Sequence, residues 1–167
     1  LFDENKPFTA ILGGAKVSDK INVIEKLIDL VDNIIIGGAM ANTFIKSKGG
    51  NIGKSLFEED NLSVANSLIE KAEKQNVKIY LPEDLVCSKS IDNYNTKIFN
   101  SYNLPYEYSG FDVGYKSINT FKEVIKRSKK IIWNGPMGVF EIDAFSKGTF
   151  EICNFVTEIG RAHVWTP

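Results

Sequence analysis

The sequence predicts an α/β domain built on a mainly parallel sheet. Short apolar runs of strand length alternate with longer segments in which apolar residues recur at helical spacing, and three of the runs end in glycine-rich turns. Such alternation is typical of a sheet whose faces are covered by helices. The chain has 167 residues, of which 43% are hydrophobic and 25% charged, and this composition suits one globular domain of ordinary size.

The first half of the chain is predicted to open with a strand at residues 8–12, which ends in Gly13 and Gly14. The helix that follows has apolar residues three and four positions apart on one face, and Ser18 and Asp19 are suited to its N-terminal end. The residues of this apolar face are Ile21, Ile24, Leu27, Ile28 and Val31. The next elements are predicted, in order, as a strand, two helices, a strand and its extension or restart: residues 34–36, 39–48, 59–75, 77–81 and 84–88.

The second half begins with a polar stretch, residues 89–110, which is rich in Asn, Tyr and Ser and lacks a sustained period. We expect an irregular excursion there, with one short strand at residues 97–99. The regular pattern then resumes with a predicted helix at 118–125, a buried strand at 131–133 and a closing helix at 144–156. No internal repeat or low-complexity linker interrupts this pattern.

Glycine-rich turns follow three of the predicted strands. They are Gly13-Gly14, Gly37-Gly38 and residues 134–138, which read Asn-Gly-Pro-Met-Gly. In parallel sheets, ligands bind outside the carboxyl ends of the strands, where loops lead into helices. A single glycine pair is explained equally well by a tight turn or a helix cap. Three such turns at one edge of a sheet indicate a ligand-binding site.

Lys16 and Lys20 stand four positions apart at the start of the first predicted helix, so both ammonium groups can lie on one side near its positive end. Without an anion, the two charges repel each other and oppose the helix dipole. Phosphate oxygens would reverse both effects and would accept hydrogen bonds from the free amides of the first turn. The alternative is that Asp19 and solvent screen the pair. Asp19 could also hold a lysine in position or approach a nucleotide-bound Mg²⁺.

Two familiar nucleotide-binding motifs do not fit the sequence. Residues 53–55 (Gly-Lys-Ser) match the end of a P-loop, but Lys48 stands where that motif needs a glycine, and a helix rather than a strand precedes it. This segment is interpreted as a surface loop. The residues after Gly14 read Ala-Lys-Val, so the dinucleotide fingerprint GxGxxG is also missing, and a standard NAD-binding unit is a poor fit.

Composition argues against several classes of protein. Twenty Lys and Arg residues against 21 Asp and Glu leave a net charge of −1, which offers nucleic acid or an anionic membrane no general basic surface. No apolar run is long enough to span a membrane, and the first residues lack the features of a signal peptide. Cys87 and Cys153 lack metal-site spacing, and His163 is the single histidine, which leaves little for zinc binding or imidazole catalysis. Two distant cysteines favour a reduced, cytoplasmic location.

Several segments closely resemble signatures of the phosphoglycerate kinase family, and they occur in that family's order. Residues 10–20 (AILGGAKVSDK) resemble its nucleotide-site signature, and residues 133–141 (WNGPMGVFE) resemble its adenosine-binding segment. The segments that are similar to a glycine turn and two loops of the family are residues 36–41, 52–56 and 110–114. The resemblance runs from about Leu1 to about Thr157.

This resemblance implies a fold and a function. Phosphoglycerate kinases move a phosphoryl group between 1,3-bisphosphoglycerate and ADP with Mg²⁺, giving 3-phosphoglycerate and ATP, and they have two Rossmann-like domains that close on each other. The resemblance covers part of the C-terminal one, and so implies an incomplete three-layer nucleotide-binding domain over residues 1–158. The acceptor site would be missing, together with later segments that supply an Mg²⁺-linked aspartate and a helix N-terminus for phosphate. The fragment alone is expected to be inactive, and the whole enzyme to be a cytoplasmic monomer.

The resemblance also implies roles for individual residues. Lys16 would be the catalytic residue that stabilises the migrating phosphoryl group, and Lys20 would hold terminal phosphate oxygens. Asn134 would contact the nucleotide phosphates and Glu141 the ribose hydroxyls. Further contacts to the nucleotide, mainly around the adenine, would come from Gly14, Ala15, Gly38, Leu56, Gly110, Phe111, Gly135, Pro136, Met137, Val139 and Phe140.

Two positions depart from the family pattern: Ala39 stands where many members have a third glycine, and Tyr115 where they commonly have proline. Ala39 adds a methyl group beside the expected adenine turn. This methyl group would affect the fit of the base and not the phosphate chemistry. Trp133 and Phe140 can equally be core residues or ligand contacts.

Two other functions are compatible with such a fold: a non-catalytic nucleotide-binding module and a dinucleotide-binding domain of an oxidoreductase. The missing GxGxxG fingerprint counts against the oxidoreductase. The residues that count against the module are Lys16, Lys20, Asn134 and Glu141.

Residues 159–167 (IGRAHVWTP) are predicted to be non-native. The nucleotides ATC GGA AGA GCA CAC GTC TGA ACT CCA, which belong to a widely used sequencing-library adapter, translate to this string if TGA is read as Trp165. His163 would then be an artefact without a role. We expect the segment to pack poorly, because it interrupts the closing helix, and we interpret both ends of the chain as cuts in a longer protein.

Overall fold

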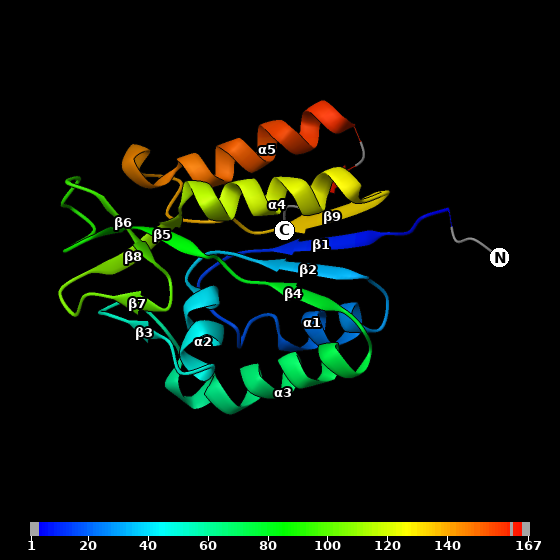
Figure 1. The fold of residues 1–167 in the computed structure, drawn as a ribbon, viewed down its shortest axis with the longest axis horizontal. Coiled ribbons are helices and arrows are strands. Elements are labelled where there is room, and N and C mark those ends of the chain that lie inside the picture. The colour runs from blue at the N-terminus through cyan, green and yellow to red at the C-terminus, as the bar shows by residue number, and fades with distance from the viewer. Residues whose placement is uncertain (1–3, 161, 165–167) are drawn as a thin grey trace.

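The computed structural model describes residues 4–160 and 162–164. Its centre is a five-stranded parallel sheet with the strand order β10-β9-β1-β2-β4 (Figure 1). The strands of this sheet are β1 (Phe8–Leu12), β2 (Asn33–Ile36), β4 (Lys78–Tyr80), β9 (Lys130–Asn134) and β10 (Ala162–Val164). Leu12 at the end of β1 is in register with Ile36 of β2 and with Asn134 of β9. The turns that follow these three strands therefore leave the sheet at one edge.

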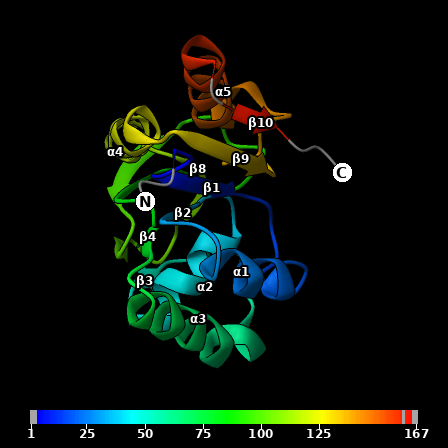
Figure 2. The same ribbon diagram turned by 90° about the vertical axis from the view of Figure 1, so that its right-hand side faces the viewer.

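Helices cover both faces of the sheet and complete three layers (Figure 2). The helices are α1 (Ile21–Ile28), α2 (Met40–Ser47) and α3 (Leu62–Lys74) on one face, and α4 (Tyr115–Arg127) and α5 (Lys147–Ile159) on the other. Strand β1 contributes side chains to two hydrophobic clusters, one on each face of the sheet. Ala10 and Leu12 pack against α1–α3, whereas Ile11 packs against α4 and α5. Burial on two faces explains why the strand is apolar except for Thr9. The predicted α/β fold is confirmed.

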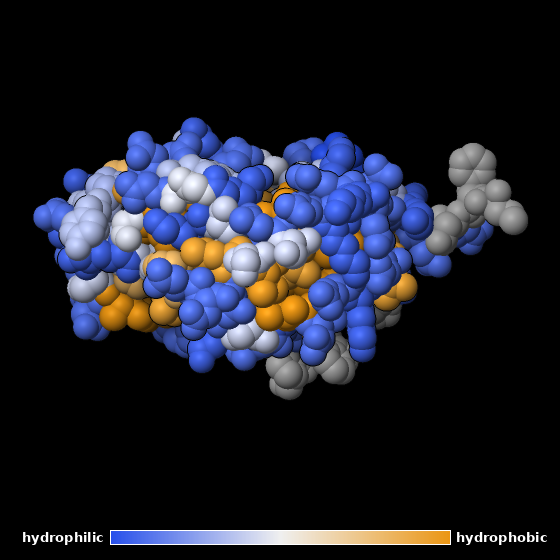
Figure 3. Space-filling view, turned by 90° about the horizontal axis from the view of Figure 1, so that it is seen from below, coloured by the Kyte–Doolittle hydropathy of each residue, from blue (hydrophilic) through white to orange (hydrophobic). Residues whose placement is uncertain are grey.

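The helices are amphipathic, as their spacing predicts. Ile24, Leu27 and Ile28 of α1 are buried, and Ile21 packs partly buried against the same cluster. Figure 3 shows the layer that contains α1 and α3 from below, where a band of hydrophobic residues crosses a face that is otherwise hydrophilic. Within the described residues, none of the helices has both the length and the apolar character that crossing a bilayer requires.

A smaller group of strands projects from one end of the main sheet (Figure 1). It consists of an antiparallel sheet in the order β6-β5-β8 and a parallel pair of β3 and β7. The bounds are β3 (Asn51–Ile52), β5 (Asp84–Ser88), β6 (Lys97–Asn100), β7 (Asn103–Leu104) and β8 (Ser109–Val113), with short 3-10 helices at Glu59–Asn61 and Asp143–Phe145.

The second sheet corrects two expectations about residues 84–110. Residues 84–88 restart as a strand of a different sheet and do not extend β4. The stretch at 89–110 is less irregular than predicted, because it contains β7 and the first residues of β8 besides the expected strand at 97–99. Strand β5 pairs with β8, in a register that matches Leu85 with Val113. Local sequence patterns do not reveal a pairing between such distant segments.

The start of α1 also differs from the prediction. The helix begins at Ile21 with Lys20 as its N-cap residue, and no side chain caps it. Ser18 is not a cap, because its amide and its hydroxyl both donate hydrogen bonds to the carboxylate of Glu58. Lys16 and Lys20 therefore belong to a loop at the carboxyl edge of the sheet, and not to one turn of a helix.

Helix α5 ends at Ile159, where Gly160 adopts a left-handed conformation with φ of 63°. Residues Ala162–Val164 then pair in parallel with β9. The expectation of poor packing is wrong for the backbone of these three residues, because the open edge of β9 offers main-chain hydrogen bonds to any strand-forming segment. The non-native origin of residues 159–167 stays a prediction, and residues 161 and 165–167 lie outside the described part of the chain.

Candidate functional site

The three glycine turns interlock at the carboxyl edge of the main sheet. A Cβ atom placed on Gly13 would lie 1.9 Å from the backbone oxygen of Pro136, and one placed on Gly38 would lie 2.4 Å from the oxygen of Gly14. Hydrogen bonds join the same turns, because the Gly14 amide donates to the Pro136 oxygen (3.1 Å) and the Gly38 amide to the Met137 oxygen (2.9 Å). Residues without a side chain make this close approach possible. The predicted meeting of three turns at one edge is confirmed.

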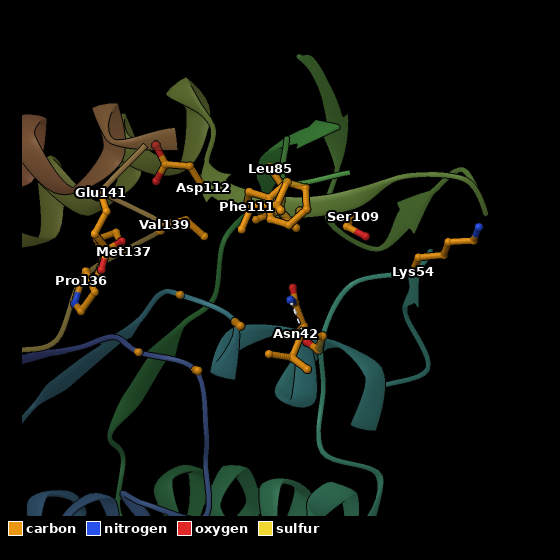
Figure 4. Close-up of a pocket in the computed structure, with 18 residues that line it drawn as sticks. Asn42, Lys54, Leu85, Ser109, Phe111, Asp112, Pro136, Met137, Val139 and Glu141 are labelled. Atoms are coloured by element: carbon orange, nitrogen blue, oxygen red, sulfur yellow. Dashed lines mark hydrogen bonds between the residues drawn. The ribbon is translucent and has the colours of Figure 1, made fainter. Parts of the chain in front are cut away.

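A cleft of about 440 Å³ opens beside these turns (Figure 4). Its size falls within the range of small-molecule sites. Figure 4 shows Phe111 and Leu85 on one side of the cleft and Asn42 on the opposite side, with Pro136 and Met137 of the turn after β9 near Glu141. Glu141 and Lys54 lie at its two ends. The lining is mainly apolar, with charged groups at the rim, and this arrangement suits a flat molecule that carries a polar extension.

Most of the site residues that the sequence indicated line this cleft. They are Gly14, Ala15, Gly38, Leu56, Gly110, Phe111, Pro136, Met137, Val139 and Glu141. They come from the turns after β1, β2 and β9, from the loop after β3 and from β8, which are far apart in the sequence. Ala39, the departure from the family glycine, also lines the cleft. Tyr115 is the first residue of α4 and is not among the lining residues.

The two lysines and Asp19 lie on the same loop as the first glycine turn but are not part of the lining. The Lys20 ammonium donates a hydrogen bond to the side-chain oxygen of Asn134. A Cβ atom on Gly14 would lie 3.6 Å from Cε of Lys20, so the lysine side chain lies along this turn. Lys16 and Asp19 are exposed. The structure thus joins Lys20 to the turn after β9 and leaves Lys16 and Asp19 facing solvent.

Gly135, Trp133 and Phe140 lie at or near the turn after β9, but none of them lines the cleft. Gly135 has a φ of 89°, and a Cβ atom there would lie 2.4 Å from the oxygen of Gly13, so Gly135 builds the turn without lining the cleft. Trp133 is a core residue with 6% exposure, and its Nε1 donates to the Gly135 oxygen at 2.7 Å. Phe140 is 40% exposed and is not brought into the lining.

The loop after β3 is more than the surface loop that its sequence suggested. Lys54 and Leu56 line the cleft, and the buried Ser55 accepts a hydrogen bond from the Gly110 amide through Oγ at 2.9 Å. Glu58 then binds Ser18 on the lysine loop. Slight burial acts to raise the pKa of Glu58, but the hydrogen bonds from Ser18 outweigh it and the pKa lies below its usual value. The loop after β3 therefore holds both the loop that carries Lys16 and Lys20 (the lysine loop) and the start of β8 through hydrogen bonds.

Besides Lys54 and Gly138, sequence reasoning missed five further lining residues, which are Asn42, Leu85, Ile91, Ser109 and Asp112. Asn42 lies on α2, where a polar residue in an otherwise buried helix was the available signal. The other four belong to the second sheet and its loops, whose pairing no local pattern predicted.

Asp112 is a buried carboxylate in the wall of the cleft, with 2% exposure. Its Oδ1 accepts a hydrogen bond from the Val113 amide (2.9 Å), and its Oδ2 accepts one from the Gly148 amide in the first turn of α5 (2.8 Å). A Cβ atom on Gly138 would lie 2.4 Å from the same Oδ1. Burial raises the pKa of Asp112 to about 7, although the two amide hydrogen bonds act in the opposite direction. The carboxylate therefore joins β8, α5 and the turn after β9.

Within the described part of the chain, no three His, Cys, Asp or Glu side chains are grouped so that they could hold a metal ion.

The chain is similar to known proteins of one family. A family model described as phosphoglycerate kinase matches residues 1–165. Among curated proteins, the chain is 59% identical to a phosphoglycerate kinase of Finegoldia magna over 155 residues, which are 92% of this chain and 39% of that protein. It is 46% identical to a phosphoglycerate kinase of Thermus thermophilus over 153 residues, which are 91% of this chain and 39% of that protein.

Solved structures give the same result. A phosphoglycerate kinase from Coxiella burnetii superposes with a TM-score of 0.92 and 39% identity, covering 97% of this chain and 42% of that one. A phosphoglycerate kinase from Pyrococcus horikoshii shares the fold, with a TM-score of 0.82 at 24% identity over 98% of this chain and 43% of that one. The chain thus spans about two fifths of the length of the relatives it matches. On the family match, the identities and the site that these residues build, the chain belongs to the phosphoglycerate kinase family.

Proposed function

We propose that the chain forms the nucleotide-binding part of an enzyme that transfers a phosphoryl group between 1,3-bisphosphoglycerate and ADP, giving 3-phosphoglycerate and ATP. One observation carries the proposal: three interlocked glycine turns and a two-lysine loop converge on one mainly apolar cleft. The apolar slot suits a purine, and the ammonium groups beside it suit the phosphates.

Phosphoryl transfer depends mainly on positioning and on neutralising charge, and it requires no histidine base. The hydrogen bond to Asn134 holds the Lys20 ammonium beside the first turn, where it would bind terminal phosphate oxygens. Lys16 is exposed, and within the described residues its charge acts on Glu58 without a hydrogen bond or an ion pair. Its ammonium is therefore available to stabilise the migrating phosphoryl group. We assign this catalytic role to Lys16.

The nucleoside would lie in the cleft with its base between the Gly38 turn and Phe111. Pro136, Met137 and Val139 would complete the apolar wall, and Gly14, Ala15, Leu56 and Gly110 its edges. Glu141 stands exposed at the rim, where its carboxylate can accept hydrogen bonds from both ribose hydroxyls. A carboxylate at that place would repel a phosphate, so the triphosphate chain would run away from Glu141 and toward the lysine loop.

The donor set fits Mg²⁺ that arrives with the nucleotide. Mg²⁺ in such sites is bound through one or two carboxylates together with substrate phosphates. Asp19 is an exposed carboxylate on the lysine loop, next to Lys20, and it forms no ion pair with the described residues. When bound, the ion would neutralise part of the phosphate charge.

The second substrate, 3-phosphoglycerate or 1,3-bisphosphoglycerate, would bind to parts of the enzyme outside these residues. From its family we expect a cytoplasmic, monomeric enzyme, and a net charge of −1 offers nucleic acid or an anionic membrane no general basic surface. Positioning two reactants together supplies roughly 7 to 11 kcal/mol of barrier reduction, and this chain can position one of them.

A coupled assay tests this proposal with the chain and the full-length gene product at equal concentrations. We expect phosphotransfer between ATP and 3-phosphoglycerate from the full-length product and no measurable turnover from the chain alone. Comparable turnover by the chain alone would contradict the proposal that the second substrate binds outside these residues. ADP binding by the full-length product without any phosphotransfer would favour a non-catalytic nucleotide-binding module instead.

A further inference from the structure

Asn42 presents an unused hydrogen-bond acceptor to the cleft. It lies on α2 with 2% exposure, and it lines the cleft. Its Nδ2 donates to the backbone oxygen of Leu56 at 3.1 Å. Because a carbonyl oxygen can only accept, this bond fixes which end of the amide faces Leu56. The Asn42 Oδ1 is left without a hydrogen-bond partner within the described residues.

The direction of this amide is visible in Figure 4. Asn42 rises from α2 toward Phe111, on the side of the cleft that lies away from Glu141. The apolar side chains of Leu56, Leu85 and Phe111 line the cleft here, and Ser109 and Lys54 lie on the same side, away from Glu141. The carboxylate of Asp112 is already occupied by two backbone amides. Asn42 therefore presents a solvent-accessible acceptor to the cleft, and a base that displaces water from it without offering a donor loses free energy.

A donor on the ligand would match this acceptor. In the proposed orientation, the ribose lies at Glu141 and the base extends between the Gly38 turn and Phe111. The edge of the base that is remote from the sugar then faces Asn42. In adenine, that edge carries the 6-amino group, which is a hydrogen-bond donor. The position of the base and the hydrogen-bonding chemistry therefore both pair Oδ1 of Asn42 with the 6-amino nitrogen of adenine.

We propose that Oδ1 of Asn42 accepts a hydrogen bond from the 6-amino group of adenine, so that this residue contributes to recognition of the base. The proposal rests on the proposed nucleotide site. It assigns to Asn42 a role in specificity in addition to its structural bond to Leu56. A residue that only tied α2 to the loop after β3 would support every nucleotide equally.

A pair of ligands separates these two roles. ADP and purine riboside 5′-diphosphate differ in the 6-amino group alone, so their affinities report on that group. Both are titrated by calorimetry into the full-length gene product and into its Asn42→Leu variant, which keeps a similar volume and removes the amide. We expect the variant to bind ADP about tenfold more weakly, the scale of one hydrogen bond, and to bind the analogue with less than a twofold change.

Thr43→Val provides the matched control. Thr43 is the next residue of α2, it does not line the cleft, and its Oγ1 accepts a hydrogen bond from the Glu58 amide at 3.1 Å. This variant also loosens α2 from the loop after β3. We expect it to change the affinities for ADP and for the analogue by the same factor.

Equal losses of ADP and analogue affinity in Asn42→Leu would overturn the proposal and leave Asn42 a structural residue. If that variant does not fold, equal affinities of the unmodified protein for the two ligands would overturn it as well. A folded protein that binds neither ligand would instead contradict the nucleotide site itself. The failure of the inference and the failure of the proposed function are thus distinguishable.

Discussion

Lys20 and Asn134 are joined by a side-chain hydrogen bond, although they stand 114 positions apart in the sequence. Lys20 precedes α1 and Asn134 ends β9, and the contact forms because β1 and β9 are neighbours in the sheet. It brings together the two segments that carry the strongest family signatures. The amide of Asn134 and the ammonium of Lys20 are therefore positioned before any phosphate binds, which reduces the entropy that binding must overcome.

The two lysines are expected to differ in their effects on catalysis. In the full-length gene product, Lys16→Met should lower kcat by roughly 100-fold or more and change ADP affinity little, because its charge is needed most in the transition state. Lys20→Met should weaken ADP by about tenfold, since it removes a charged contact to the bound phosphates. Steady-state kinetics and calorimetric titration separate the two effects. A large loss of ADP affinity in Lys16→Met, without a loss of kcat, would contradict this assignment.

Glu141 is expected to bind the ribose. Glu141→Ala should weaken ADP by roughly 1 to 3 kcal/mol, the scale of a charge-assisted hydrogen bond, and should weaken a 2′,3′-dideoxy analogue much less. Calorimetric titration of both ligands into both proteins measures this coupling. Equal losses for the two ligands would place Glu141 somewhere other than the ribose and would reverse the orientation proposed for the whole pocket.

Gly38 is expected to be intolerant of any side chain. It has a φ of 69°, and a Cβ atom would lie 2.4 Å from the Gly14 oxygen. Gly38→Ala should therefore lower the free energy of unfolding by about 3 kcal/mol or more. Gly49→Ala is the matched control, because Gly49 also has a positive φ of 85° but has no atom within 4 Å of the added Cβ.

Urea unfolding measures both glycine variants. The control should lose only the cost of the left-handed conformation, about 1 kcal/mol. Equal losses in the two variants would mean that the turns of Gly14 and Gly38 are not in close contact in solution.

Asp112 is expected to make stability depend on pH. Burial raises its pKa from 3.8 to about 7, so the native state binds this proton more tightly than the unfolded chain. The stability from this group is therefore fully present below about pH 4 and is lost as the pH rises toward about 7. The full difference is on the order of 4 kcal/mol.

Urea unfolding of the unmodified protein and of Asp112→Asn at pH 5 and at pH 8 tests this dependence. The asparagine does not titrate, and other groups cancel in the comparison. We expect the unmodified protein to lose stability relative to the variant between the two pH values. A difference that stays constant would show that Asp112 ionises with an ordinary pKa.

The origin of residues 159–167 can be tested without any protein. Resequencing the locus from genomic DNA should find codons for other residues after the position of Glu158, because residues 159–167 match the translation of a sequencing adapter. The strand β10 does not argue against this, since its described backbone pairs with an open sheet edge. The same codons in frame within an intact gene would overturn the prediction.

Sequence periodicity predicted most of the main sheet and its helices correctly. Each strand of residues 8–12, 34–36 and 131–133 appears within one or two residues of its expected bounds. These elements are local, and their apolar spacing records which face each one buries. The glycine turns were also visible, because only a close approach or a positive φ accounts for paired glycines at three strand ends.

The tertiary structure decided the features that depend on distant partners. The second sheet exists because β5 pairs with β8, and this pairing brings Leu85, Ser109 and Asp112 to the cleft. Ser18 resembles a helix cap in sequence, but the carboxylate of Glu58 competes successfully for its amide and hydroxyl. The proposed role of Asn42 depends on the backbone oxygen of Leu56, which orients its amide. The sequence by itself determined the α/β fold, the family and the lysine and glycine segments, because these are written in contiguous residues. The assembled cleft depends on contacts between segments far apart in the chain, whose free energies no local pattern records.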